Sequence, residues 1–267
     1  AGTPVNRLLR EIGALDDSVG IVNHEYFYRV EDKGEAVNMY RNVDRLEEHL
    51  IEISPQDEPL IHETCKAVRA LGRLDMPIDQ PMDMYSTLDK FKIITKMLPL
   101  MSLMKKYSAI TIEDLAEKFK HPLLRDAFKR SYPKELTAIL LLMIFSSLNS
   151  GDSGIPLGGS KKLAERIAKR YTSLGGKIHY NTKVNKIKIA SGKAEGIILA
   201  DGTERSGDFV VSAADGNHTL THMLEGKYMD DKFQTLFSDR ETYITSPSVN
   251  VFVGVDCDLS NEPHGLF

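Results

Sequence analysis

Two histidines near residue 220 have the spacing of a metal-binding pair. His218 and His222 stand four residues apart in a segment that we expect to be helical, so both imidazoles would lie on one face. Glu225 follows close enough to serve as a third ligand. The H-E-x-x-H pattern of a catalytic zinc helix is missing, and the other histidines are scattered along the sequence. We therefore expect no metal site.

Ser153 lies in the tetrapeptide Gly151-Asp152-Ser153-Gly154, the G-D-S-G that surrounds the nucleophile of trypsin-like serine proteases. Those enzymes are all-β and need a histidine and an aspartate in their own contexts. The sequence before Ser153 has helical periodicity, so a turn between a helix and a glycine motif is the better interpretation. The catalytic residues stay unassigned, because no general acid or base can be named.

A helix is predicted directly after this turn. Gly158-Gly159 precedes Ser160, whose side-chain oxygen makes it the expected N-cap. Apolar residues then recur at helical spacing as far as Leu174, with charged residues on the other face. Gly175-Gly176 ends the helix, because glycine accepts the left-handed conformation of a C-terminal cap.

Short strands are predicted after this helix. Asp201-Gly202 is a strong hairpin signal. The continuous apolar run Phe209-Val210-Val211 predicts a strand buried on both faces, and Asp215 is expected to cap a further helix. The predicted strands span Lys177–Tyr180, Thr182–Ile189, Ala194–Leu199 and Asp208–Ser212.

This order of elements resembles the central segment of the phytoene-desaturase-like flavoproteins, which are relatives of the amine oxidases and retinol saturases. In that family a P-x-G-G turn precedes the helix, G-G-x-I-x-x-N-T-x-V-x-x-I follows it, and a D-G hairpin and V-V-S-A-A-D come next. The match covers about sixty residues and is far more specific than a lone glycine motif. The matching residues are Pro156, Gly158, Gly159, Gly175, Gly176, Ile178, Asn181, Thr182, Val184, Ile187, Asp201, Gly202 and Val210 to Asp215.

The resemblance implies that FAD is the cofactor and that part of this segment touches it. Glycines there would allow a close approach of the backbone. From the residues alone, the valine of the first strand is a core residue and the glycines are turn formers. The positions that the resemblance places near FAD are Val184, Ser212, Ala213, Ala214, Pro156, Gly158 and Gly159.

The family's G-x-G-x-x-G fingerprint and its late flavin segment have no counterpart in this sequence. We therefore expect the chain to be the central piece of a longer flavoprotein. The expected fold class is α/β of the mixed α+β kind, a helical and sheet-backed substrate domain with part of a Rossmann-like FAD-binding domain. We expect the first part of the substrate domain at residues 1–150, the FAD-binding segment at 151–225 and returning substrate-domain strands at 226–267.

The N-terminal part predicts a hairpin followed by helices. A short opening helix ends at Gly13, and strands over Gly20–Val30 and Ala36–Tyr40 flank a turn. Helical periodicity then recurs, and one or two long strands are predicted within Glu241–Asp256. The predicted helices span residues 46–53, 61–71, 87–107, 111–119, 122–130, 134–148 and 230–238.

Two of these helices have a functional interpretation. Leu88–Lys106 is apolar and rich in methionine and lysine, so it lies in a membrane interface or is an ordinary domain helix kinked at Pro99. The apolar run of Leu136–Leu148 is too short to cross a bilayer, which takes about 20 residues. We expect this second helix to be a core helix buried against the hairpin or the strands after Glu241. A compatible functional alternative is that one of its faces lines a pocket for an apolar substrate.

The composition is that of an ordinary globular protein, with 42% hydrophobic and 27% charged residues. A net charge of -4 gives no general basic field for nucleic acid, which we do not expect as a partner. Cys65 and Cys257 lie far apart in no metal spacing, which favours a reduced, intracellular setting. We expect a cytoplasmic protein, with peripheral membrane contact as an open alternative.

We expect the longer protein to be an FAD-dependent oxidoreductase that acts on a carbon–carbon bond of an apolar, isoprenoid or carotenoid-like substrate, as a desaturase, saturase or isomerase. The chain alone is expected to be inactive. The competing interpretation is a non-catalytic module that binds lipid or a partner through apolar and lysine-rich helices. A visible spectrum of the longer protein separates the two, because a flavoprotein is yellow.

We predict that this chain alone binds no FAD. The pyrophosphate of FAD needs backbone N–H groups at a helix N-terminus, which the family supplies from the missing fingerprint. Titration with FAD is expected to show no saturable binding at micromolar concentration, which corresponds to roughly -8 kcal/mol. Stoichiometric FAD in the purified protein would contradict this prediction.

Overall fold

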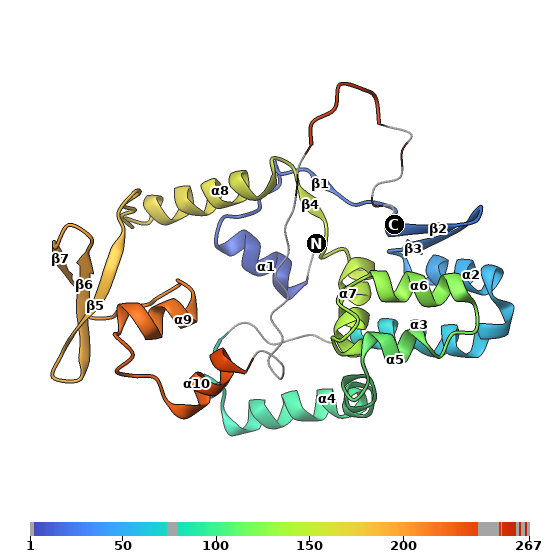
Figure 1. Ribbon diagram of the computed structural model, residues 1–267, viewed down its shortest axis with the longest axis horizontal. Coiled ribbons are helices and arrows are strands. Elements are labelled where there is room, and N and C mark those ends of the chain that lie inside the picture. Colours follow the sequence, from blue (N-terminus) through green and yellow to red (C-terminus); the bar gives the residue numbers. More distant parts are fainter. Residues whose placement is uncertain are drawn as a thin grey trace. The chain divides into compact units, whose positions relative to one another are not determined.

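The computed structural model describes residues 3–73, 80–239, 251, 253–259, 262 and 265. The chain divides into two compact units, Ala1–Gly176 with Val255–Phe267, and Lys177–Gly254. Helices predominate in the described residues and the sheets are small, which agrees with the expected mixed α/β class (Figure 1).

The first unit combines a β-hairpin with a set of helices. Strands β2 (Tyr26–Asp32) and β3 (Glu35–Tyr40) pair antiparallel, as predicted, and a short ladder joins β1 (Ile21–Val22) to β4 (Ile155–Pro156). The helices are α1 (Pro4–Glu11), α2 (Val43–Ile53), α3 (Glu58–Leu71), α4 (Thr87–Ser108), α5 (Ile112–Ala116), α6 (Pro122–Arg130), α7 (Ala138–Ser150) and α8 (Gly159–Ser173), with short 3-10 turns η1 (Pro55–Asp57) and η2 (Met82–Met84).

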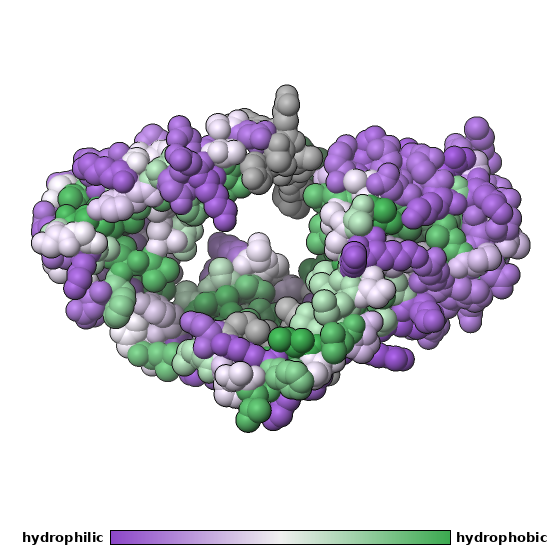
Figure 2. Space-filling view, turned by 90° about the horizontal axis from the view of Figure 1, so that it is seen from below, coloured by the Kyte–Doolittle hydropathy of each residue, from purple (hydrophilic) through white to green (hydrophobic). Residues whose placement is uncertain are grey.

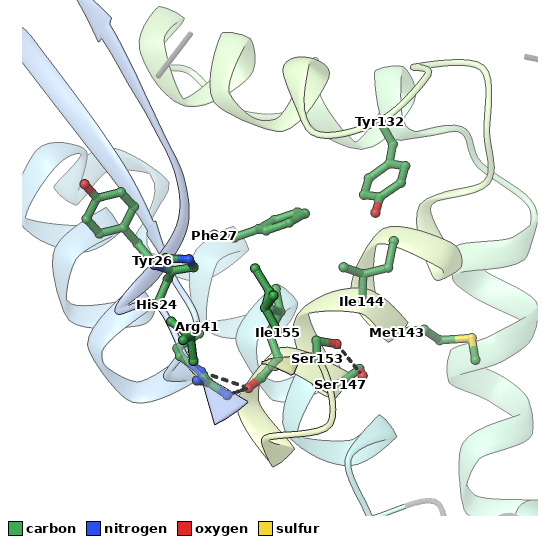
Figure 3. Close-up of a pocket in the computed structure, with 12 residues that line it drawn as sticks. His24, Tyr26, Phe27, Arg41, Tyr132, Met143, Ile144, Ser147, Ser153 and Ile155 are labelled. Carbon is green, nitrogen blue, oxygen red and sulfur yellow. Dashed lines mark hydrogen bonds between the residues drawn. The ribbon is translucent and has the colours of Figure 1, made fainter. Parts of the chain in front are cut away.

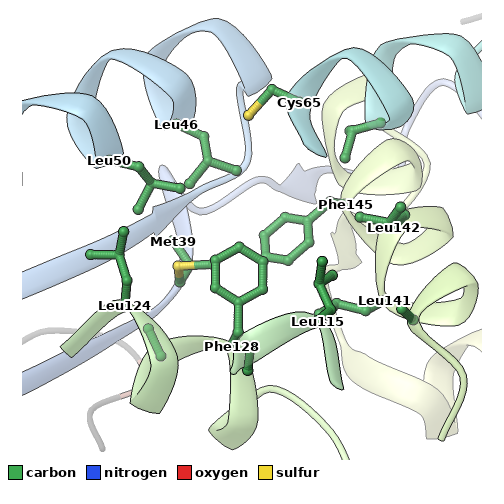
Figure 4. Close-up of a cluster of buried hydrophobic side chains, with 14 of the residues drawn as sticks. Met39, Leu46, Leu50, Cys65, Leu115, Leu124, Phe128, Leu141, Leu142 and Phe145 are labelled. Carbon is green, nitrogen blue, oxygen red and sulfur yellow. The ribbon is translucent and has the colours of Figure 1, made fainter. Parts of the chain in front are cut away.

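The core of this unit lies between the hairpin and α2, α3, α5, α6 and α7 (Figure 4). Alternate hairpin residues such as Val30 and Val37 are buried, as a strand with one covered face requires. Phe119 and Phe128 stack with ring centroids 4.6 Å apart. The outer surface around α2, α3 and α6 is largely hydrophilic (Figure 2), so the apolar residues of these helices are directed inward.

Helix α7 is buried along most of its length, which confirms the prediction for the apolar run. Its residues Leu141, Leu142 and Phe145 are among those removed from water. The packing partners differ from the prediction, because α7 lies mainly against α3, α4 and α5. Neighbouring helices cover more of a helix surface than a two-stranded hairpin can, and the hairpin reaches α7 through the ring of Phe27, 6.3 Å from that of Phe145. The strands predicted after Glu241 fall largely on residues outside the described ones.

The second unit begins with a three-stranded antiparallel meander. Its strands β5 (Val184–Ala190), β6 (Lys193–Leu199) and β7 (Glu204–Ser206) lie in the order β5-β6-β7. The helical segments α9 (Gly216–His218), η3 (Thr219–Met223, a π-helical turn) and α10 (Asp231–Ser238) follow. Asp215 caps α9 as predicted, because its carboxylate accepts a hydrogen bond from the His218 N–H at 2.8 Å.

Two strands predicted in this unit do not form. Residues 177–180 and 208–212 pair with no strand in the described part of the chain. Phe209 and Val211 are each 90% exposed, so the prediction of a strand buried on both faces is wrong. A strand of that kind needs a neighbour in the sheet and cover on each face, whereas the described sheet pairs only β5, β6 and β7 and leaves this segment without a strand partner.

A buried carboxylate joins two parts of the helical core. Asp57, at the junction of α2 and α3, accepts hydrogen bonds from the Ser54 hydroxyl at 2.7 Å and from the Lys120 and His121 N–H groups at 2.8 and 3.0 Å. Burial alone would raise the pKa of Asp57, but these hydrogen bonds outweigh it and lower the pKa below its usual range. The ionised carboxylate therefore holds the loop before α6 against the start of α3.

We predict that Asp57→Asn lowers the free energy of unfolding at pH 7 by about 2 kcal/mol, because an amide cannot accept all three hydrogen bonds. Since the folded pKa is depressed, this stabilisation is present above the unfolded pKa of about 4 and is lost as pH falls through the folded pKa. Urea titrations followed by circular dichroism should show the gap between wild type and variant narrowing below about pH 4. Asp32→Asn, at an exposed site, is the control and should change stability by less than about 0.5 kcal/mol. An equal loss of stability in both variants would contradict this role of the Asp57 carboxylate. A stability difference between wild type and Asp57→Asn that does not change with pH would also contradict it.

Candidate functional site

An apolar pocket of about 460 Å³ opens beside α7 in the first unit (Figure 3). One face of α7 lines it, and the hairpin and the β1–β4 ladder supply the remaining walls. The lining residues are Val22, His24, Tyr26, Phe27, Arg41, Tyr132, Met143, Ile144, Ser147, Leu148, Ser153 and Ile155. Met143 and Ile155 remain 46% and 53% exposed at its rim.

A sharp turn between α7 and β4 shapes one wall of the pocket. Gly151 ends α7 in the left-handed conformation, with φ of 87°. The hydroxyls of Ser147 and Ser153 then lie 2.7 Å apart across the turn, so Ser153 has a serine as its partner and the turn interpretation of G-D-S-G is supported. A side chain at Gly154 would come within 2.3 Å of Ile21, so glycine is required for β4 to approach β1.

Aromatic rings form the opposite wall. The Phe27 ring stacks on that of Tyr132 with centroids 6.4 Å apart and meets Phe145 edge-on. Phe27 and Ile144 face the open volume from β2 and α7 (Figure 3). Flat rings and a branched aliphatic side chain offer dispersion contacts along the length of a chain-like ligand.

Arg41 supplies the positive charge of the pocket. Its Nε and Nη2 donate to the carbonyl oxygen of Leu148 at 3.2 and 2.9 Å, in the last turn of α7. Carbonyl groups there have no partner within the helix and carry the negative end of its dipole, so a cation is stabilised. The sequence analysis missed Arg41, because a single arginine after a strand forms part of no motif.

The predicted glycine turn continues from the pocket wall. Ile155 lines the pocket, and the next residue, Pro156, pairs with Ile21 across the β1–β4 ladder. Gly158 and Gly159 both have positive φ, 90° and 68°. No atom lies within 4 Å of the position that a Cβ at Gly159 would take, so the backbone there is open to a ligand.

The prediction that Ser160 caps α8 is wrong. The helix begins at Gly159, its N-cap is Gly158, and no side chain satisfies the first N–H groups. The left-handed conformation of Gly158 turns the chain into the helix before Ser160 is reached. Gly158 therefore occupies the N-cap position because it can adopt the left-handed conformation, and it has no side-chain oxygen to accept a hydrogen bond.

The other predicted cofactor residues lie in the second unit. Val184 is half-buried at the start of β5, which is an edge strand, so one row of its backbone groups has no strand partner in the described sheet. Ser212, Ala213 and Ala214 are exposed in an irregular segment, where the Ser212 hydroxyl lies 2.8 Å from that of Thr219.

The residues present fit part of FAD. The free edge of β5 suits hydrogen bonds to an adenine, and the open backbone at Gly159 suits a flat ring system. The sequence lacks the G-x-G-x-x-G that would hold the pyrophosphate. The fit is therefore partial, because each unit taken by itself offers backbone groups and neither offers a recognised site for the pyrophosphate.

The histidine pair lies close together without further ligands. The rings of His218 and His222 are 4.9 Å apart, and the described residues hold no group of three or more metal-ligating side chains. Hydrogen bonds from Lys186 and Lys227 lower the pKa of Glu225 to about 2, which ties this carboxylate to lysines.

Known proteins that resemble this chain include phytoene desaturases and prolycopene isomerases. The chain is 29% identical to a phytoene desaturase (neurosporene-forming) of Rhodobacter capsulatus over 234 residues, which is 82% of this chain and 43% of that protein. It is 36% identical to a phytoene desaturase of Fusarium fujikuroi over 96 residues, 35% of this chain and 16% of that protein. It is 26% identical to a chloroplastic prolycopene isomerase of Arabidopsis thaliana over 118 residues, 44% of this chain and 19% of that protein.

The chain spans less than half the length of each of these relatives. A family model described as flavin containing amine oxidoreductase matches residues 1–263, almost the whole chain. The central motif from Pro156 to Asp215, the open glycine turn and the mixed α/β fold agree with this match. The chain belongs to the family of flavin containing amine oxidoreductases.

Proposed function

We propose that this chain carries the substrate pocket of a flavin-dependent oxidoreductase that acts on a carbon–carbon bond of an apolar, carotenoid-like substrate, as a desaturase, saturase or isomerase. The observation that carries the proposal is the apolar pocket whose wall, at Ile155, runs directly into the open glycine turn. In this arrangement a chain bound over Phe27 and Ile144 would reach the turn near which the family places its flavin.

The pocket supplies binding energy by removing an apolar chain from water. Each buried CH₂ group contributes about 0.8 kcal/mol, so several isoprene units would supply the binding energy without any charged contact. FAD, when bound, supplies the hydride chemistry. The residues described here hold and orient the apolar chain and exclude water from it, while Val184, Ser212, Ala213 and Ala214 would meet the adenine side of the cofactor and Pro156, Gly158 and Gly159 the ring side.

A fluorescent polyene tests the pocket. Methyl cis-parinarate, a neutral tetraene ester whose emission rises in apolar surroundings, is expected to bind saturably to the purified protein. Ile144→Trp places a large ring in the pocket and should weaken binding about tenfold or more, since the volume for the chain is lost. Leu140→Trp is the matched control, because Leu140 lies on α7 outside the pocket and is partly exposed. No saturable binding, or equal binding by both variants, would contradict the proposal.

We also propose that α4 touches a membrane surface. Among the described residues no helix is both long and apolar enough to cross a bilayer, but α4 presents an apolar stripe to solvent. Leu88 and Phe91 are 74% and 65% exposed, and the stripe continues along the same face through Ile94, Leu98 and Met101. Lys92 and Lys96 are exposed on the same helix, so positive charge accompanies the exposed apolar side chains.

Binding to liposomes that contain phosphatidylserine tests this contact. We expect sedimentation with the liposomes at low salt and release as salt rises, because screening acts over about 8 Å at physiological ionic strength. Changing Lys90, Lys92 and Lys96 to glutamate should weaken binding about tenfold or more, at about 1 kcal/mol for each lysine. The control changes Lys161, Lys169 and Lys193, three exposed lysines of other elements, to glutamate. If the control variant loses as much liposome binding as the α4 variant, the proposal that α4 contacts the membrane surface is wrong.

A further inference from the structure

The pocket combines apolar walls with one cation at its edge. Figure 3 shows Arg41 at one side of the open volume and Tyr132 at the other, with Phe27 and Ile144 between them. Two N–H groups of Arg41 hold the end of α7, and the guanidinium also places a positive charge at the edge of the apolar volume. A guanidinium in that position suits a ligand whose end group is an oxyanion.

Within the part of the chain that the structure describes, Arg41 interacts with a helix end and not with a carboxylate. Nε and Nη2 are directed to the Leu148 carbonyl, and Arg41 forms no ion pair with an acidic side chain of the described residues. Several other arginines of the first unit pair with carboxylates, although Arg166, like Arg41, donates to a backbone carbonyl. Arg69 pairs with Asp44 and Glu47, Arg125 with Glu117, and Arg130 with Asp126.

The contact with α7 fixes the guanidinium in place. Arg41 directly follows β3, and its N–H donates to the Glu25 carbonyl at 3.2 Å, so the backbone is held at the hairpin while the side chain is held at the helix end. An arginine fixed at both ends loses little further entropy when a ligand binds. Planar guanidinium groups recognise planar oxyanions such as carboxylates.

We propose that the natural ligand of this pocket is an apolar, isoprenoid-type chain that ends in a carboxylate, with the carboxylate at Arg41 and the chain across Phe27 and Ile144. A carboxylate carries one negative charge, which matches the single guanidinium of the lining, whereas a diphosphate carries more charge than the lining compensates. This inference rests on the proposed function and narrows its substrate class to chains with an oxidised end.

Two probes that differ only in their charge test the inference. cis-Parinaric acid and its methyl ester share one tetraene chain, and both report binding by fluorescence. At pH 7.5 and low salt we expect the wild-type protein to bind the acid about tenfold or more tightly than the ester, as charge-assisted hydrogen bonds imply. Arg41→Gln should bring the affinity for the acid to that for the ester and leave the ester within about twofold.

The controls separate this inference from the proposed function. Arg125→Gln removes an arginine that lies outside the pocket and should keep the preference for the acid. Ile144→Trp should weaken both probes, because it removes room for the chain. Equal binding of acid and ester by the wild type, or an equal loss of both in Arg41→Gln, would overturn the role of Arg41 and leave the apolar pocket standing. Failure of both probes to bind would overturn the pocket itself and this inference with it.

Discussion

The removal of α7 from water is the constraint on which the first unit depends. This helix is apolar around nearly its whole circumference, and exposing one large apolar side chain in place of burying it costs about 1.5–3 kcal/mol. Helices α3, α4 and α5 cover one part of its surface, and Phe27 of the hairpin covers another. The face that carries Met143 and Ile144 is only partly covered and forms one wall of the pocket. The pocket thus opens on a part of the helix that the fold does not bury completely.

The end of the same helix positions the polar groups of the site. The Leu148 carbonyl fixes Arg41, and Gly151 turns the chain toward β4 and the glycine turn. One structural event, the termination of α7, therefore sets both the charge at the edge of the pocket and the direction of the segment that the family places beside its flavin. A substitution that extends α7 by a turn would displace all of these together.

Features that depend on local periodicity could be predicted from the sequence. Features that depend on contacts between residues far apart in the chain could not. The helices, the β2–β3 hairpin and the cap at Asp215 follow from spacing and side-chain chemistry within a few residues. Phe209 and Val211 looked like a buried strand, yet burial depends on neighbours that the run itself does not specify. Arg41 could not be singled out, because its role comes from Leu148, more than a hundred residues away in the chain. The sequence favoured a buried core helix for α7 and left a pocket on one of its faces as an alternative, and the aromatic wall of that pocket is visible only in three dimensions.

Photolabelling can show directly whether the pocket beside α7 binds an apolar chain. A polyene ester with a diazirine at the chain end, activated by light in the complex and mapped by mass spectrometry, reports which residues lie against the bound chain. We expect labels on the segments around Phe27, Tyr132 and Ile144, and their loss in the presence of excess unlabelled ester. Labels confined to α4 or to the second unit would contradict it.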